Sequence, residues 1–386
     1  MKKHIALLLI LSLLLLAACS APPAVNGGEI TDATDTGSAH PTEQTMESPS
    51  AVYDGLMAAA SMPLIVEHCT SEDGKPIAYY THQDMHITLP DADVAQIITL
   101  DLLNRIDRTR SDAEDVFRSA KADYSAQGTW HPYSYVITCS PMRLDQNILS
   151  LYVFETAFDG SPRTTHNIYS LNYDLATGDI LNLVTIFHEE NFADAICDLV
   201  IEGLAALDQD TLYSDYESIV RDKFSTNATV ESWYFGESGL CFYFTPYEIA
   251  PYVSGVVVSE ISYEALSGLL KDKYFPGEKL NYTGSLTAQV ITADNAALLD
   301  NFRQFANVTV EPGTKQFLIN TQGSVSNVRI HQTTDSSTGI IESTILLVPG
   351  MGPSDGILLE VSESTAAQSL YITYESNGRV ETFRFS

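Results

Sequence analysis

An expected helix between two sets of strand-like runs limits the fold more than any other feature of the sequence. Asp91 is a favourable N-cap residue, and apolar residues recur every four positions after it, as one face of a helix requires. The residues of this stripe are Val94, Ile98, Leu102 and Ile106. A polar break precedes a second stripe over 116–124, and strand-like alternation lies on both sides, at 62–89 and 133–157. This order indicates an α+β module over residues 55–145.

The next block, residues 146–275, again mixes strands with helices. A strand is expected over 165–174, and helices are expected over 192–207, 213–224 and 260–271. The two blocks are therefore expected to be two α+β modules, each with an antiparallel sheet packed by helices.

The pattern changes from about residue 280, where the runs become short, β-rich and regularly spaced. The pair Asn377-Gly378 between two apolar runs is typical of a hairpin with a type I′ turn. These signals predict a β-sandwich-like domain over 280–386. The expected fold class is therefore α+β, with two α+β modules followed by a C-terminal β-sandwich-like domain.

Composition excludes several classes of function. The chain has 386 residues, of which 45% are hydrophobic, and this is enough for a packed core. It carries 50 Asp and Glu against 20 Lys and Arg, a formal net charge of −30. This acidity argues against nucleic acid as a partner, because phosphates require clustered basic side chains. It also argues against a polybasic contact with anionic lipid.

The N-terminal residues predict export. Two lysines precede an apolar run over residues 5–18, which spans ~21 Å as a helix and is too short for a ~30 Å bilayer core. Residues 1–18 are therefore expected to be a signal peptide. The segment Leu16-Ala17-Ala18-Cys19-Ser20 resembles a bacterial lipobox, which implies cleavage before Cys19 and its acylation, with palmitate among the chains. An ordinary secretory signal with a coincidental cysteine is the alternative.

The expected product is a lipoprotein held on the extracytoplasmic face of the bacterial cell membrane by its lipid anchor. Two or more acyl chains give stable attachment to a bilayer. Residues 19–50 are polar, lack aromatic side chains and are expected to form a disordered tether. About 30 flexible residues have a root-mean-square reach of roughly 30 Å, enough to lift the folded part clear of the headgroups.

The remaining cysteines are few and far apart. They are Cys69, Cys139, Cys197 and Cys241. No CxxC pair exists, so a zinc-finger or thioredoxin-type site has no support. An exported compartment permits disulfides, but buried free thiols fit equally well, and no pairing is assigned.

Two long motifs stand in the second block. Residues 170–187 read SLNYDLATGDILNLVTIF, and residues 242–252 read FYFTPYEIAPY. In this order they resemble the extracytoplasmic domain of the lysozyme-sensing anti-sigma factor RsiV. The likeness covers roughly residues 62–272, including the smaller α+β domain that precedes the motifs. It implies an exported α+β domain with a meandering sheet packed by helices. One member of that family binds lysozyme, and others occur beside peptidoglycan deacetylase domains.

The sequence departs from the family in two places. Family members carry a Gly-Gly-Ala-His loop before the Asn-Tyr-Asp strand, whereas residues 159–166 read DGSPRTTH, so the histidine is displaced and one glycine is absent. A ligand role for this loop is therefore in doubt. No cytoplasmic segment precedes the signal peptide, so we do not expect an anti-sigma mechanism.

The second motif permits two interpretations. Pro246 and Pro251 fix φ and remove two donors, so they are expected to end a strand and shape a rigid loop. Tyr247 and Tyr252 are able to pack their rings while their hydroxyls find partners, and Glu248 is able to accept hydrogen bonds from backbone amides in the loop. The motif is thus either a structural corner or a ligand-binding edge.

Catalytic motifs are not found. The sequence contains no HExxH, GxSxG, Walker or GxGxxG pattern. His82 and His86 stand four residues apart in a strand-like run, where ~13 Å separates them, too far for shared metal ligation. His131 and His166 are lone histidines, which are more often satisfied or exposed groups than bases. We therefore expect no catalytic residues, no metal and no cofactor.

The leading hypothesis is a non-enzymatic binding module of the cell envelope, with Cys19 as its lipid attachment site. The candidate binding residues are Tyr247, Glu248 and Tyr252. The partner is expected to be a basic extracellular protein such as a cationic lysozyme, which an acidic surface would steer in, or peptidoglycan. The alternative is a peptidoglycan-associated enzyme or an accessory module of one.

Overall fold

The computed structural model describes fourteen segments of the chain. They are residues 42–45, 49–52, 58–125, 129–161, 164–188, 192–207, 211–225, 230–277, 283–292, 296–299, 314–336, 339–353, 355–362 and 369–385. The expected signal peptide, Cys19 and most of the expected tether lie outside these residues.

A six-stranded sheet forms the centre of the molecule. Its strands, in spatial order, are β1 (Thr42–Thr45), β4 (Leu64–Thr70), β5 (Pro76–Gln83), β7 (Tyr133–Leu144), β8 (Ile148–Phe158) and β9 (Thr165–Asp174). All neighbours are antiparallel except β5 and β7, which are parallel. A parallel pair needs a long crossover, and the chain makes it through helix α1.

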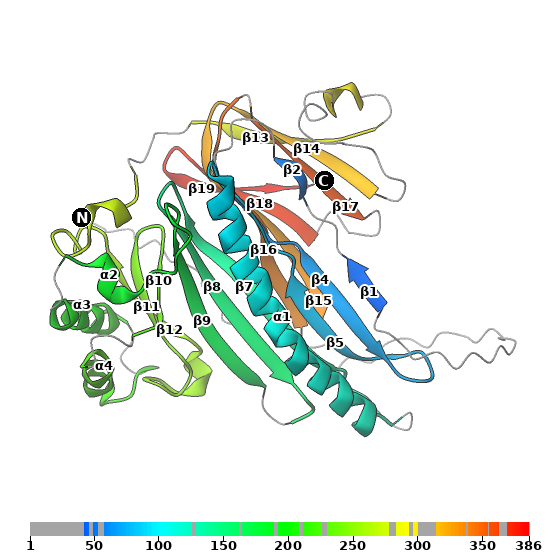
Figure 1. The fold of residues 1–386 in the computed structure, drawn as a ribbon, viewed down its shortest axis with the longest axis horizontal. Coiled ribbons are helices and arrows are strands. Elements are labelled where there is room, and N and C mark those ends of the chain that lie inside the picture. The colour runs from blue at the N-terminus through cyan, green and yellow to red at the C-terminus, as the bar shows by residue number, and fades with distance from the viewer. Residues whose placement is uncertain are drawn as a thin grey trace, which may run out of the picture.

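Helix α1 (Ala92–Asp123) lies across this sheet (Figure 1). It begins where the sequence predicts, since the Asp91 carboxylate accepts hydrogen bonds from the amides of Asp93 and Val94. The helix runs through the polar stretch between the two stripes and is continuous over 32 residues. Thr109 and Ala113 are small and buried, so they carry the stripe through the polar stretch without interrupting it.

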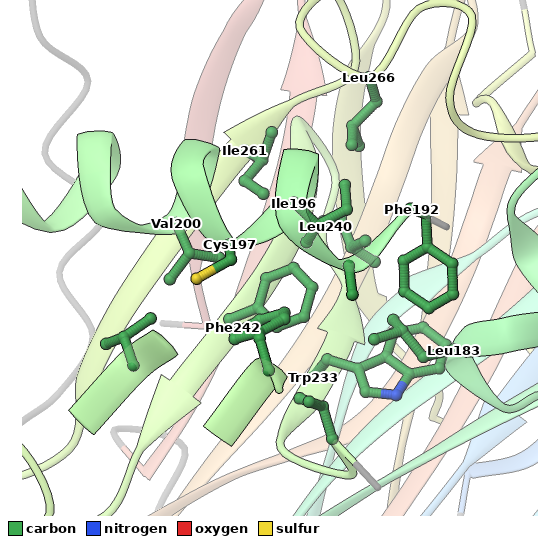
Figure 2. Packing of buried hydrophobic residues seen from close by; sticks show 14 of the residues in the cluster. Leu183, Phe192, Ile196, Cys197, Val200, Trp233, Leu240, Phe242, Ile261 and Leu266 are labelled. Carbon is green, nitrogen blue, oxygen red and sulfur yellow. The ribbon is translucent and has the colours of Figure 1, made fainter. Parts of the chain in front are cut away.

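A second core lies between three helices and a three-stranded sheet. The helices are α2 (Leu183–Ile186), α3 (Ala193–Ala205) and α4 (Tyr216–Phe224), and the sheet order is β10 (Trp233–Phe235), β11 (Gly239–Phe244), β12 (Val257–Ser262). Short 3₁₀ turns η2 (Tyr252–Ser254) and η3 (Asp272–Tyr274) follow β11 and β12. Figure 2 shows Ile196 and Val200 of α3 lying over Leu240 and Phe242 of β11, all of them buried.

The prediction of a helix over 260–271 is wrong at its start, where the structure has a strand. Residues 257–262 form β12, whose burial alternates with a period of two and whose Ile261 pairs with Leu240 of β11. Turns follow over 263–269. Pairing with a buried neighbouring strand therefore outweighs the helical spacing of the apolar residues.

The C-terminal residues form a sandwich of two sheets. One sheet has the order β13 (Ser285–Val290), β14 (Thr314–Gln322), β17 (Gly356–Ser362), β2 (Pro49–Val52). The other has the order β19 (Arg379–Arg384), β18 (Leu370–Ser376), β15 (Val325–Ser336), β16 (Gly339–Met351), β3 (Ala59–Ser61), β6 (His86–Thr88). Residues of both sheets share one buried core, and the 3₁₀ turn η4 (Ala296–Leu299) follows β13.

The expected fold class is confirmed, because helices and largely antiparallel sheets precede a β-rich C-terminal region. The hairpin at Asn377-Gly378 has φ of 53° and 68°, the two positive values that a type I′ turn requires.

The sheets cross the expected boundaries between domains. The boundary at 145/146 falls in the hairpin between β7 and β8, so the two expected α+β modules share one sheet. Strands β1 and β2 lie within or beside the expected tether and pair with β4 and β17. Composition does not reveal such pairing, because the main chain of any polar segment is able to extend an open sheet edge.

The four cysteines of the described chain, Cys69, Cys139, Cys197 and Cys241, are buried free thiols. They occupy three separate hydrophobic clusters, Cys69 and Cys139 sharing one. Within the part of the chain that the structure describes, none of the helices combines the length and apolar character needed to cross a bilayer.

Candidate binding site

The turn after β11 displays the tyrosines of the second motif. The strand ends at Phe244, and the amide of Glu248 then donates to the carbonyl of Thr245 while the amide of Tyr247 donates to the carbonyl of Ala250, each at 3.0 Å. Tyr247 has φ of +73°, a left-handed conformation that bulky residues rarely adopt. Buried Ile249 and Ala250 fix the turn to the core beneath.

Glu248 holds this turn from behind. One carboxylate oxygen accepts from the Thr245 amide at 2.9 Å, and the other lies 2.5 Å from the Lys223 ammonium on α4. Lys223 also stands 5.0 Å over the ring of Phe244. The expected hydrogen bonding of Glu248 to a backbone amide is therefore present. Because both oxygens are engaged inside the protein, the role that the structure supports for Glu248 is bracing the turn.

Four aromatic rings stand in a row beside the turn, and we call them the aromatic row. They are Phe154 on β8, His166 on β9, Tyr252 in η2 and Tyr247 in the turn. Successive ring centroids lie 5.4, 6.1 and 5.5 Å apart, with interplanar angles of 32°, 30° and 32°. The row therefore joins the six-stranded sheet to the loop that carries the second motif.

His166 links the two halves of this row. Its Nε2 lies 2.9 Å from the Tyr252 hydroxyl. Its Nδ1 is buried and has no hydrogen-bond partner among the described residues. Burial lowers the pKa of His166 below its ordinary value, so the ring is neutral near pH 7.

One end of the row faces solvent. Tyr247 is 54% exposed, Tyr252 is 43% exposed, and the next residue, Val253, is 86% exposed. Neighbouring apolar and aromatic side chains that are left in water in this way mark interaction sites more often than scattered ones do. Aromatic rings with a polar tip are also the side chains most enriched at protein interfaces.

The first motif is used inside the protein. The Tyr173 hydroxyl donates to Asp101 of α1 at 2.7 Å, and the Asn172 amide donates to the carbonyl of Trp233 at 3.2 Å. Asp174 pairs with Lys273 at 2.6 Å. This motif therefore joins the sheet to α1 and to the second core, which explains its residue types without a ligand.

A partly buried ionic cluster lies between the six-stranded sheet and α1. Glu67 accepts two hydrogen bonds from Arg110, at 2.8 and 3.1 Å, and lies 3.1 Å from Nε2 of His82. His86 pairs instead with Asp84, so the two histidines have different partners, and both lie on strands as expected. Among the described residues, no group of three or more His, Cys, Asp or Glu side chains is placed to hold a metal ion.

Sequence reasoning found part of this site. The motif identified Tyr247, Glu248 and Tyr252, and the structure brings the two tyrosine rings together. It missed Phe154 and His166, because His166 lies 86 residues from Tyr252 and reads as a lone histidine. The only signal in the sequence was the family resemblance, which places a histidine in a nearby loop.

Part of this region matches a known family model. Residues 185–264 match the family model described as "Protein of unknown function (DUF3298)". The matched residues run from α2 into the turn after β12 and include Tyr247, Glu248 and Tyr252. No curated protein matches the chain.

Two solved structures of DUF3298 family proteins are similar to this chain. One is from Bacteroides fragilis NCTC 9343, with 18% identity, a TM-score of 0.40, and coverage of 59% of this chain and 96% of that chain. The other is from Pseudomonas aeruginosa PAO1, with 14% identity, a TM-score of 0.37, and coverage of 62% of this chain and 99% of that chain.

Proposed function

We propose that this chain is a cell-envelope lipoprotein whose folded part is a non-enzymatic binding module, with Tyr247 and Tyr252 at the centre of its binding face. The observation that carries the proposal is the conformation of Tyr247. A tyrosine with φ of +73° costs backbone energy, yet the residue is 54% exposed and contributes little to the core. Strain of this kind at an exposed aromatic side chain points to a role outside folding.

The way the face is built supports the same conclusion. Glu248, Lys223 and the buried Ile249 fix the turn from behind, and the rings of Tyr247 and Tyr252 lie 5.5 Å apart in front. A rigid aromatic surface loses little conformational entropy when a partner binds, which is why tyrosine and tryptophan dominate interface hot spots.

The partner that we propose is a basic extracellular protein of the lysozyme type. The net charge of −30 would steer a cationic protein toward the molecule. The motif over 242–252 resembles the extracytoplasmic domain of the lysozyme-sensing factor RsiV, and one member of that family binds lysozyme.

Calorimetry tests this proposal. A basic lysozyme titrated into the full-length chain in detergent should release or absorb heat with a saturable stoichiometry. The affinity should fall as salt rises, because screening weakens attraction between opposite net charges. Absence of heat with lysozymes of several types would remove this partner from consideration.

The anchor is a separate part of the proposal. The lipobox resemblance of residues 16–20 supports acylation at Cys19 and an extracytoplasmic, membrane-attached position. Cells supplied with labelled palmitate should label the wild-type chain and leave Cys19→Ser unlabelled. Equal labelling of both chains would contradict acylation at this residue.

A further inference from the structure

The centre of the aromatic row is a histidine whose second ring nitrogen is buried and has no hydrogen-bond partner in the described part of the chain. We propose that His166 is a positioning residue for the binding face: its neutral imidazole fixes the Tyr252 ring, and protonation of the imidazole releases that ring. This inference rests on the proposed function of the aromatic row and adds a pH dependence to it.

His166 is placed to fix the position of the Tyr252 ring. Main-chain hydrogen bonds fix the backbone of η2, from Ser254 to the Pro251 carbonyl at 2.9 Å and from Gly255 to the Tyr252 carbonyl at 3.0 Å. The Tyr252 side chain is 43% exposed, so core packing restrains it only in part. The hydrogen bond to Nε2 of His166 at 2.9 Å and the ring contacts with His166 and Tyr247 supply the rest.

The imidazole fits its position only in the neutral form. Nε2 is hydrogen-bonded to the Tyr252 hydroxyl, whereas Nδ1 is buried and no described residue pairs with it. In the tautomer with its proton on Nε2, Nδ1 is an acceptor without a donor. Burying such an acceptor costs less than burying an N–H group without an acceptor. Protonation adds a charged N–H at Nδ1 with no acceptor, and a buried unpaired cation is far more costly than a buried unpaired neutral group. Rotation of the ring toward water satisfies that N–H and breaks the bond to Tyr252.

Among the described residues, no neighbouring charge opposes this release. β8 places Phe154 and Thr156 beside His166, and η2 places Tyr252 there. None of these side chains is a carboxylate or a basic group. Burial alone lowers the pKa of His166, with no contribution from a carboxylate among the described residues. The neutral form therefore persists at neutral pH and is lost below the ordinary histidine range.

The test places a fluorotyrosine at position 252 of the full-length chain in detergent and follows its fluorine resonance from about pH 7.5 to about pH 4.5, which spans ordinary histidine titration. The resonance should move with a single midpoint below about pH 6.5. His166→Gln keeps an amide donor near the position of Nε2 and does not titrate, so its resonance should resemble the neutral wild type throughout. His166→Ala should resemble the acidic form at every pH. His131→Gln changes an exposed histidine elsewhere, and in this variant the fluorine resonance at position 252 should move with pH as it does in the wild type.

Lysozyme binding gives a second readout. The wild-type affinity should weaken about fivefold to tenfold across the transition, the worth of one hydrogen bond, while the affinity of His166→Gln stays flat. A resonance at position 252 that ignores pH, or one that moves equally in His166→Gln, would overturn the inference. Failure of lysozyme to bind at neutral pH would contradict the proposed partner alone, because the fluorine measurement decides the role of His166 without a ligand.

Discussion

The guanidinium of Arg329 on β15 lies 3.0 Å from the carboxylate of Glu237 in the turn between β10 and β11. The same guanidinium donates to the main-chain carbonyls of Pro141 and Met142 on β7. One side chain of the C-terminal sandwich therefore contacts both the six-stranded sheet and the turn beside the second core.

Arg329→Met is expected to lower the free energy of unfolding by about 2 kcal/mol. The change leaves Glu237 and two carbonyls without their donor, but Glu237 remains 41% exposed, so the loss is smaller than the ~3–5 kcal/mol of a fully buried pair. Urea unfolding measures the change. Arg118→Met, which removes an exposed pair with Asp115 on α1, is the matched control and should cost less than about 0.5 kcal/mol. If the two substitutions lowered the free energy of unfolding equally, the contacts of Arg329 with β7 and Glu237 would not stabilise the fold.

Tyr173→Phe tests the structural role of the first motif. The hydroxyl of Tyr173 donates to Asp101, which also accepts from Arg105 at 2.8 Å, so its removal should cost about 1–2 kcal/mol. Tyr213→Phe removes a hydroxyl at a half-buried site away from this network and serves as the control in the same urea experiment. A loss of lysozyme binding by Tyr173→Phe without any loss of stability would instead make the first motif part of the binding face.

The fold was predictable where local signals agree with tertiary contacts. Asp91 caps α1 as its residue type predicts, and Asn377-Gly378 forms the expected type I′ turn. The prediction failed where tertiary contacts decide. Thr109 and Ala113 continue the helix because they fit against the sheet, and Ile261 extends because it pairs with Leu240. Those partners lie beyond the short local stretches from which helices and strands are predicted.

The candidate site divides in the same way. A contiguous motif carries Tyr247 and Tyr252, so sequence alone identifies them. The register of β8 and β9 and the path of the loop after Pro251 place Phe154 and His166 beside them. That juxtaposition depends on three segments far apart in the chain, which spacing does not encode.

Acid is expected to destabilise the fold through Glu67 and His82. Burial raises the pKa of Glu67, but hydrogen bonds and charge from Arg110 and His82 outweigh it, so that pKa lies below its ordinary 4.5. Burial lowers the pKa of His82, against the opposing pull of Glu67. Both groups hold protons more tightly in the unfolded chain. Stability should therefore fall below about pH 6.5 and again below about pH 4.5, as each folded pKa is passed.

Glu67→Gln tests the direction of this pH dependence. It should cost about 1 kcal/mol at neutral pH, because Arg110 is 47% exposed and stays partly solvated, and it should flatten the loss of stability below about pH 4.5. Asp115→Asn, on the exposed face of α1, should leave the profile unchanged. The measurement is the urea midpoint of unfolding at a series of acidic pH values. If the midpoint of Glu67→Gln fell below about pH 4.5 as steeply as that of the wild type, Glu67 would not be the group responsible.

The cysteines are expected to stay reduced and unreactive in the folded chain. Burial raises the pKa of the Cys139 and Cys241 thiols to about 12 and raises those of Cys69 and Cys197 as well. In a Cys19→Ser variant, a thiol reagent near pH 8 should therefore react slowly until denaturant is added, and then with all four thiols. Fewer thiols after denaturation without a reductant would reveal a disulfide.

The most direct test of the central claim is the affinity of the Tyr247→Ala/Tyr252→Ala chain for a basic lysozyme, measured calorimetrically against the wild type. Loss of two interface tyrosines should weaken binding at least about thirtyfold, since hot-spot side chains are each worth ~1–2 kcal/mol or more. Val380→Ala, a change at a 68% exposed apolar residue on β19, should bind like the wild type. A double variant that binds with the wild-type affinity would contradict the assignment of this aromatic face as the binding site.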